Sequence, residues 1–285
     1  MIHLQNEEMA SHSTFKIGGI AKDVYLPESL EEFREIYSED FAVIGNGSNI
    51  LFCDGIIKTP IIITTKMNGF HFDGEKIAAE CGALVISLAH EAAKRGLSGL
   101  EFAGGIPGTV GGCIYMNAGA HGGQISNVVV SSQLLVVSDE QIDDGQVVTF
   151  NKEQHEFGYR KSVFQDTGDI ILQTTLELEE GSSEEITRKM KDNLAKRKAS
   201  QPMDFPSAGS VFKKAGNISA GEFIDKCGLK GKTIGGAQIS SKHAGFIVNI
   251  GGATAQDVLD LIEFVKADVL KQQGIALEEE VRIIK

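Results

Sequence analysis

Hydrophobic side chains recur at helical spacing in five stretches of the chain. The predicted helices cover residues 29–37, 84–95, 188–198, 221–227 and 255–273. Ser29 is the expected N-cap of the first helix, and Glu32 is placed to complete a capping box. Thr254 is the expected N-cap of the last helix, which should end before Gly274.

Short apolar runs predict the strands. They cover residues 41–44, 61–65, 77–81, 128–137, 147–150, 170–178, 246–250 and 277–284. The three runs between 128 and 178 follow one another without a helical segment, so we expect them to pair as antiparallel strands. The chain is therefore expected to combine strands with interspersed helices.

A domain boundary is predicted after residue 200. The segment QPMDFPSA, residues 201–208, holds two of the five prolines. Proline disfavours helix both at its own position and at the residue before it. We therefore expect domains at 1–200 and 201–285.

Two glycine-rich loops are the most informative local feature. The segment EFAGGIPGTVGGCIYMNAGAH, residues 101–121, contains six glycines, and GNGSN, residues 45–49, follows the apolar run 41–44. Either loop alone could be an ordinary tight turn. Together they predict two backbone cradles for a large phosphorylated ligand, because glycine lets main-chain N–H groups approach a ligand closely.

The loops do not fit the best-known nucleotide motifs. No Gly-Lys-Ser/Thr follows either loop, which excludes a Walker A site, and neither matches GxGxxG at the start of a helix in a βαβ unit. A Rossmann fold is therefore disfavoured.

Composition narrows the class of protein further. A net charge of −12 over 285 residues opposes general nucleic-acid binding. No apolar stretch reaches the roughly 20 residues that span a bilayer, and the first residues lack a signal-peptide core, so a cytoplasmic protein without membrane insertion is expected. The basic helix 188–198 is either a solvated face or a site for an anion.

Cysteine and metal chemistry are not indicated. The four cysteines, Cys53, Cys81, Cys113 and Cys227, are scattered and are expected to be buried thiols. No His, Cys, Asp and Glu grouping has convincing metal spacing, so no metal is predicted.

Three further segments, GYRKSVF, AGSVFKK and LEEEVRIIK, concentrate polar groups. Arg160 could bind a ligand carboxylate through two parallel hydrogen bonds or form a surface salt bridge. Ser210 could present its hydroxyl from a turn as a proton donor or simply cap that turn, and no base is visible to make it a nucleophile. Strand alternation would place Glu278 and Glu280 on one face with Arg282, either in solvent or in a cleft.

In order along the chain, these motifs resemble a known family, the UDP-N-acetylenolpyruvoylglucosamine reductases of peptidoglycan precursor synthesis. The matching segments are TFKIGG, IGNGSNIL, GLEFAGGIPGTVGG, MNAGAHGG, GYRKSVF, PSAGSVFK, AQISSKHAGFIVN and LEEEVRIIK. The resemblance covers nearly all of the chain. The absence of a long tyrosine-bearing insertion is similar to the shorter subtype.

The resemblance implies an α+β fold. It consists of a two-lobed FAD-binding domain of the vanillyl-alcohol-oxidase type, with lobes of about 1–66 and 67–200, and then an α+β substrate-binding domain whose last strand returns to the active site. Non-covalent FAD would be held around its diphosphate by the glycine loops. The implied cofactor-binding residues are Ile44, Gly45, Asn46, Gly47, Ser48, Asn49, Gly104, Gly105, Ile106, Pro107, Gly108, Thr109, Gly111, Gly112, Asn117 and Gly119.

The resemblance also implies the reaction. NADPH would pass a hydride to FAD, which would pass it to C3 of the enolpyruvyl group of UDP-N-acetylglucosamine enolpyruvate, giving UDP-N-acetylmuramate. Arg160 would stabilise the charge on the carboxylate, Glu280 would assist, and Ser210 would protonate C2. Lys213 is the candidate proton source behind Ser210, on spacing alone.

Substrate contacts are implied for Tyr159, Lys213, Gln238, Lys242, His243 and Asn249. For His243, a structural hydrogen bond is the competing interpretation. Two departures from the family pattern are Lys214 and Ala215 after SVFK, and Glu279 where proline is common. A monomer or weak oligomer is expected.

Two alternatives remain open at this stage. One is a flavin-dependent alcohol oxidase of the same fold, in which His121 or Cys113 would attach flavin covalently. The other is a nucleotide-sugar-binding regulatory protein that has kept the fold and lost turnover.

Overall fold

The computed structural model describes residues 1–37, 40–137 and 146–285. Their α-carbon contacts separate two compact units. The first unit comprises residues 1–3, 25–46 and 61–197, and the second comprises 4–24, 47–60 and 198–285. The division between the units falls within β1 (Ile2–Glu8) and β2 (Ile20–Leu26). The split predicted from the sequence, at residue 200, stays a prediction.

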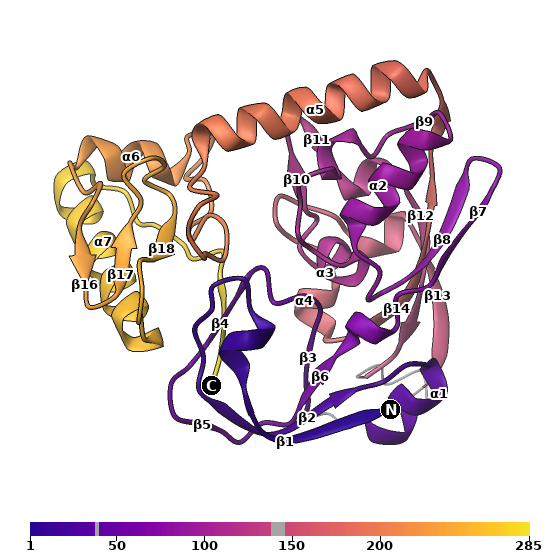
Figure 1. Ribbon diagram of the computed structural model, residues 1–285, viewed down its shortest axis with the longest axis horizontal. Coiled ribbons are helices and arrows are strands. Elements are labelled where there is room, and N and C mark those ends of the chain that lie inside the picture. Colours follow the sequence, from indigo (N-terminus) through magenta and orange to yellow (C-terminus); the bar gives the residue numbers. More distant parts are fainter. Residues whose placement is uncertain (38–39, 138–145) are drawn as a thin grey trace. The chain divides into compact units, whose positions relative to one another are not determined.

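An antiparallel sheet forms the centre of the first unit (Figure 1). Its strand order is β13-β12-β14-β8-β7, and the strands are β7 (Phe70–Asp73), β8 (Lys76–Glu80), β12 (Val129–Leu135), β13 (Val147–Asn151) and β14 (Ile170–Glu177). The antiparallel pairing predicted for the three strands between 128 and 178 is confirmed. Strands β3 (Ala42–Ile44) and β6 (Ile61–Ile63) pair in parallel at one end of a second sheet, whose strand order is β1-β2-β6-β3.

Helices and two short strand pairs complete the first unit. The helices are α1 (Leu30–Ile36), α2 (Val85–Lys94), α3 (Val110–Tyr115), α4 (Phe164–Thr167) and α5 (Ser183–Ser200), whose last three residues belong to the second unit. Short strands β9 (Leu97–Ser98) and β15 (Glu179–Glu180) pair, as do β10 (Gly119–Ala120) and β11 (Gly123–Gln124). Fully buried Ile77, Leu88, Leu134, Phe164 and Leu176 lie in the apolar core between the layers.

The second unit has its own core. Helices α6 (Ala220–Lys226) and α7 (Ala255–Gln273) pack with the antiparallel strands β16 (Thr233–Ile234), β17 (Ala237–Ile239) and β18 (Ile247–Asn249). Strand β19 (Arg282–Ile284) pairs in parallel with β4 (Ile50–Phe52), and β5 (Ile56–Ile57) pairs with the start of β2. Phe15, Leu51, Val211, Leu261 and Val281 share the apolar cluster of this unit.

Helix α7 shows how closely local signals fixed the secondary structure. The Thr254 side chain accepts a hydrogen bond from the N–H of Asp257, and the Asp257 carboxylate accepts one from the N–H of Thr254. Gly274 ends the helix with a φ of 67°, as predicted. Ser29 caps α1 as predicted, but Glu32 accepts from the N–H of Glu28 and does not complete a capping box.

Two other expectations are wrong. The last strand was expected from residue 277, but the regular ladder begins only at Arg282. The cysteines were all expected to be buried, but only Cys81 and Cys113 are, while Cys53 and Cys227 are half-buried. Short strands such as β4 and β5 carry too little pattern to be predicted.

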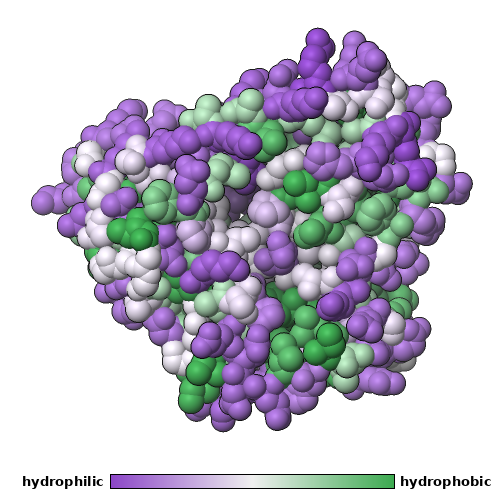
Figure 2. Space-filling model, in the orientation of Figure 1, coloured by the Kyte–Doolittle hydropathy of each residue, from purple (hydrophilic) through white to green (hydrophobic). Residues whose placement is uncertain are grey.

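Within the described residues, no helix is both long and apolar enough to cross a bilayer. On the face that Figure 2 shows, hydrophilic residues cover most of the surface and hydrophobic residues gather in small groups.

A buried polar network joins two strands of the first unit to the loop that follows β13. The His155 ring is fully buried. Its Nε2 lies 2.9 Å from Ser132 Oγ, which lies 2.9 Å from Thr174 Oγ1, and its Nδ1 lies 2.7 Å from the carbonyl oxygen of Asn151. Because every polar atom of the ring has a partner, this network fixes the loop at little desolvation cost.

The pKa of His155 gives a stability prediction. Burial lowers this pKa below its usual value, although the bond to Asn151 opposes the shift. The folded protein therefore holds its proton less tightly than the unfolded chain. The resulting stability is complete above about pH 6.5 and is lost as the pH falls toward the folded-state pKa, at up to about 1.4 kcal/mol per pH unit.

We expect His155→Gln to flatten this fall in the free energy of unfolding, measured by urea denaturation between about pH 5 and pH 8. His90, exposed on α2, provides the control His90→Gln, which should keep the wild-type slope. Identical slopes in the wild type and His155→Gln would contradict the prediction.

Candidate functional site

The two glycine loops meet within the first unit. Asn46 Nδ2 donates a hydrogen bond of 2.7 Å to the carbonyl oxygen of Pro107. A Cβ at Gly45 would lie 2.2 Å from Thr109 Oγ1, so no larger residue fits there without rearrangement. Thr109 in turn caps α3 by accepting from the N–H of Gly112 at 3.3 Å. The predicted cofactor residues Ile44, Gly45 and Asn46 are thus brought together with the loop 104–112.

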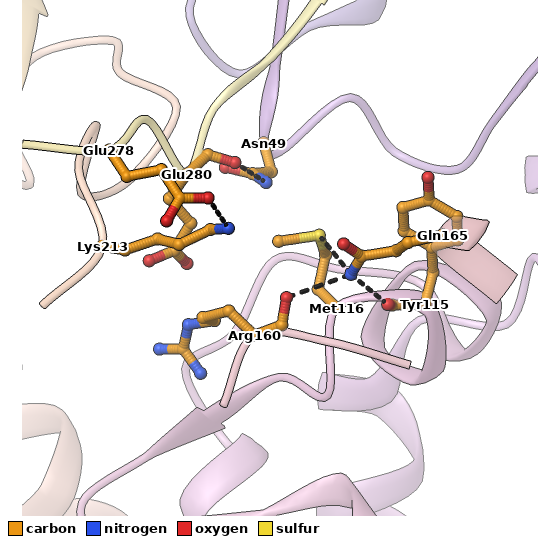
Figure 3. A network of polar contacts seen from close by, with 8 residues as sticks. All are labelled: Asn49, Tyr115, Met116, Arg160, Gln165, Lys213, Glu278 and Glu280. Atoms are coloured by element: carbon orange, nitrogen blue, oxygen red, sulfur yellow. Dashed lines mark hydrogen bonds and ion pairs between the residues drawn. The ribbon is translucent and has the colours of Figure 1, made fainter. Parts of the chain in front are cut away.

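The rest of the GNGSN loop belongs to the second unit. Gly47 has a φ of +61°, and a Cβ there would lie 2.1 Å from the carbonyl oxygen of His12. Asn49 Nδ2 donates to the carbonyl oxygen of Glu280 at 2.9 Å (Figure 3). Gly47 therefore leaves no space for a larger side chain, and Asn49 holds the main chain of Glu280.

Arg160 is presented from a strained position in the first unit. It has a φ of +54°, which is uncommon for a non-glycine residue. Its guanidinium donates to the carbonyl oxygens of Asn117 at 3.4 Å and Gly119 at 3.1 Å, and it lies 5.3 Å from the centre of the Tyr159 ring. Two main-chain carbonyls therefore hold the guanidinium in place.

The backbone around Arg160 is held equally firmly. Gln165 Nε2 donates to the carbonyl oxygens of Arg160 at 3.0 Å and Tyr115 at 2.8 Å (Figure 3). Asn117 Nδ2 donates to the carbonyl oxygen of Gly158 at 2.8 Å, and Asn117 Oδ1 accepts from the N–H of Ser126. Asn117, which was predicted to bind cofactor, is buried, and its side chain holds the loop that carries Arg160.

Ser210 lies in the second unit, at an isolated bridge to the segment before β18. Its hydroxyl donates toward the carbonyl oxygens of Phe212 at 3.2 Å and Gly245 at 3.4 Å. Lys213, the expected proton source behind Ser210, instead pairs its ammonium group with the carboxylate of Glu278 (Figure 3). The structure does not support that assignment for Lys213.

The segment before β19 contains a bulge. The N–H groups of Glu280, at 2.7 Å, and Val281, at 3.4 Å, both point to the carbonyl oxygen of Val211. A bulge of this kind interrupts strand alternation and re-aims side chains. The bulge lies between Glu280 and Arg282, so the expectation that alternation places Glu278 and Glu280 on one face with Arg282 assumed a regular strand that does not continue through this segment.

The three glutamates have different surroundings. Glu278 pairs with Lys213, and Glu279 lies 2.9 Å from the Lys266 ammonium group. Glu280 has both of its main-chain polar groups held, the N–H by Val211 and the carbonyl by Asn49.

His243 lies close to Ser210 in the second unit. Its Nδ1 accepts from the N–H of Gly245 at 3.2 Å, and its ring packs edge-on against Phe246. A Cβ at Gly245 would lie 3.1 Å from the His243 ring and 3.2 Å from Ser210 Oγ. Burial is the main cause that lowers the pKa of His243, and the charge of Lys230 lowers it further.

The other predicted substrate residues differ in how much of their side chains the fold uses. Asn249 is buried, donates to Phe15 and Lys16, and accepts from the main chain of residues 251 and 253, so its geometry favours a structural role. Gln238 donates to Thr233 at 3.0 Å. Lys242 donates to the carbonyl oxygen of Lys198 at 2.5 Å. Their contacts with substrate stay predictions.

Of the two suspected sites of covalent flavin attachment, Cys113 is poorly suited to it. Burial raises the pKa of the Cys113 thiol to about 12, although the charge of Arg160 opposes the shift. A thiol in that state has almost no nucleophilic thiolate at neutral pH. Burial lowers the pKa of His121, and the charges of Arg197 and Lys196 lower it further.

Comparison with known proteins identifies the family. Residues 24–149 match the model of an FAD binding domain, and residues 201–284 match that of the UDP-N-acetylenolpyruvoylglucosamine reductase C-terminal domain. A UDP-N-acetylenolpyruvoylglucosamine reductase 2 of Bacillus cereus is 45% identical, over 98% of this chain and 92% of that protein. The chain belongs to the UDP-N-acetylenolpyruvoylglucosamine reductase family.

Other members of the reductase family agree. The protein of that name from Pediococcus pentosaceus is 42% identical, over 99% of this chain and 94% of its own length. The crystal structure of the Thermus caldophilus reductase superposes with a TM-score of 0.85 at 34% identity, over 100% of this chain and 98% of that one. The expected family, the α+β fold of this FAD-binding type and the use of FAD are thereby confirmed.

The close approach of Gly45 to Thr109 predicts a loss of FAD binding in Gly45→Ala. The added methyl would force the loops apart. We expect the purified variant to hold less than about a tenth of the wild-type flavin, read from its absorbance near 450 nm, because cradles of this kind need direct backbone approach.

Gly181 provides the control for this experiment. A Cβ there would meet nothing closer than 3.4 Å, so Gly181→Ala should keep its flavin. Full flavin content in Gly45→Ala would show that the junction of the loops does not form the cofactor cradle.

Proposed function

We propose that this protein reduces the enolpyruvyl group of UDP-N-acetylglucosamine enolpyruvate to UDP-N-acetylmuramate with NADPH, in the synthesis of peptidoglycan precursors. The observation that carries the proposal is the placement of Arg160. Its guanidinium is oriented by the carbonyls of Asn117 and Gly119 in a unit that also holds Gly45, Asn46 and the glycine loop 104–112.

The chemistry requires such a group. An isolated vinyl ether resists hydride, and adding hydride at C3 places negative charge on C2 and the attached carboxylate. A pre-oriented cation that meets this charge is typically worth about 3–4 kcal/mol of transition-state stabilisation. Arg160 fills this role because a guanidinium is permanently charged and matches a carboxylate in a fork geometry.

Residues of this chain fit FAD. The junction of Gly45 and Asn46 with Pro107 and Thr109 leaves no room for a Cβ, as expected where a diphosphate lies against the main chain. The chemistry that FAD supplies when bound is hydride transfer from NADPH to C3 of the enolpyruvyl group. The glycine loops bind and orient the cofactor without covalent attachment.

Ser210 and Glu280 complete the proposed set. Ser210 gives its hydroxyl proton to C2, and Glu280 orients the substrate. The main chain of Glu280 is fixed at both polar groups, which supports Glu280 as the glutamate of this role. Residues 201–285 act as the substrate-binding domain, to which Lys213, Gln238, Lys242 and His243 contribute. The enzyme works in the cytoplasm as a monomer or weak oligomer.

The visible spectrum tests the reaction. Holoenzyme should show flavin absorbance that bleaches with NADPH without oxygen and returns when the enolpyruvyl UDP-sugar is added. An alcohol oxidase would instead bleach with an alcohol, and a binding protein would bind the UDP-sugar without any change in the flavin. Either result would end the proposal.

Ser210→Ala separates catalysis from binding. We expect kcat to fall by about 10²–10⁴-fold, because a placed general acid contributes that much. The KM for the UDP-sugar and the rate of flavin bleaching by NADPH should stay near their wild-type values, since neither needs the proton.

Ser241, exposed in the same unit, gives the matched control Ser241→Ala, which should behave as the wild type. A Ser210→Ala variant with unchanged kcat would remove the hydroxyl from the mechanism.

A further inference from the structure

Helix α5 carries basic residues along the first unit, and the proposed reaction uses none of them. Most are explained by solvation or by structural pairing. Lys189 Nζ lies 3.2 Å from the buried carboxylate of Glu101, and Asn193 Nδ2 donates to the carbonyl oxygen of Glu101 at 3.2 Å. This face of the helix therefore packs on the segment that leads into the glycine loop 104–112 (Figure 1).

Arg197 is different from the other cations of this helix. Its Nη1 donates to the carbonyl oxygen of Gly105 at 2.5 Å, and its aliphatic carbons lie close to the same glycine. Its Nε is buried and has no hydrogen-bond partner within the described residues. No ion pair joins Arg197 to a carboxylate in that part of the chain, and burial alone lowers its pKa.

A second basic group lies near Arg197. His121 has a φ of +53° and sits at the tip of the hairpin formed by β10 and β11. This hairpin packs on residues 101–103, which lead into the glycine loop, and the charges of Arg197 and Lys196 both act on the His121 ring. Within one unit, the fold thus gathers cations at a glycine loop and gives the most buried of them no counter-charge.

Such an arrangement is costly without an anion. A guanidinium stays charged at any physiological pH, and burying it with an N–H unsatisfied costs free energy. A phosphate would satisfy it, because guanidinium groups bind phosphate through paired hydrogen bonds.

We infer that Arg197, with His121 and Lys196, forms a phosphate-binding subsite beside Gly105. The inference rests on the proposed function, which supplies three phosphate-bearing ligands. They are the diphosphate of FAD, the diphosphate of the UDP-sugar and the 2′-phosphate of NADPH. The shared chemistry is a phosphate group held by a buried arginine.

The experiment compares Arg197→Met with Arg188→Met, which removes an exposed arginine from the same helix. Three constants are measured: the Kd of FAD for the apoprotein by flavin fluorescence, the KM of the UDP-sugar, and the ratio of kcat/KM for NADPH over NADH. We expect one of them to change by about 10- to 100-fold in Arg197→Met, as for the loss of hydrogen bonds to a charged group. Arg197→Lys should recover part of the loss, and Arg188→Met should match the wild type.

The constant that changes identifies the phosphate. A change in Kd assigns the cofactor, a change in KM assigns the substrate, and a loss of preference for NADPH assigns the 2′-phosphate. The inference is overturned if none of the three changes, or if all three change together with a lower Tm, because the latter means that the loop has collapsed.

A separate measurement keeps the inference independent of the reaction. Inorganic pyrophosphate added to the wild-type apoprotein should raise the pKa of His121, followed by NMR of its ring protons, and should not do so in Arg197→Met. This outcome is expected even if the wild type fails to reduce the UDP-sugar, which would end the proposed function alone. Absence of any response to pyrophosphate in the wild type would overturn the subsite.

Discussion

The close approach of two backbone segments in the first unit is the constraint on which the site depends. Gly45 stands so near Thr109 that a single added carbon would collide with its hydroxyl oxygen, and Asn46 ties the same loop to Pro107. Thr109 is also the cap of α3. The position of that helix, the shape of the glycine loop and the cofactor cradle are therefore set together, and a change at one of them must disturb the others.

A second requirement, an oriented cation, is met by main-chain groups. Carbonyl oxygens of Asn117 and Gly119 hold the Arg160 guanidinium, and Gln165 holds its backbone. The fully buried His155 fixes the same loop from the other end, because its carbonyl accepts from the N–H of Val163 at 2.9 Å. A guanidinium that is already held in place needs little reorganisation when negative charge develops on the substrate.

Features that depend on neighbouring residues in the sequence were predictable, and features that depend on contacts between distant residues were not. The capped helix α7 and the glycine loops follow from residue type and spacing. The local sequence does not show that the side chains of Asn117 and Asn249 form hydrogen bonds with main-chain groups, because those groups lie far along the chain. Arg197 lay within a predicted basic helix, but only its burial beside Gly105 separates it from its neighbours.

The carboxyl-terminal glutamates show why the distinction matters for mechanism. The resemblance to the reductase family was the basis for choosing Glu280. Strand alternation was expected to place it on one face with Glu278 and Arg282, and the bulge at Glu280 and Val281 interrupts that alternation. Rigidity supports the choice, because the main chain of Glu280 is fixed at both polar groups. A catalytic carboxylate benefits from a rigid backbone, which limits the directions in which the side chain can point.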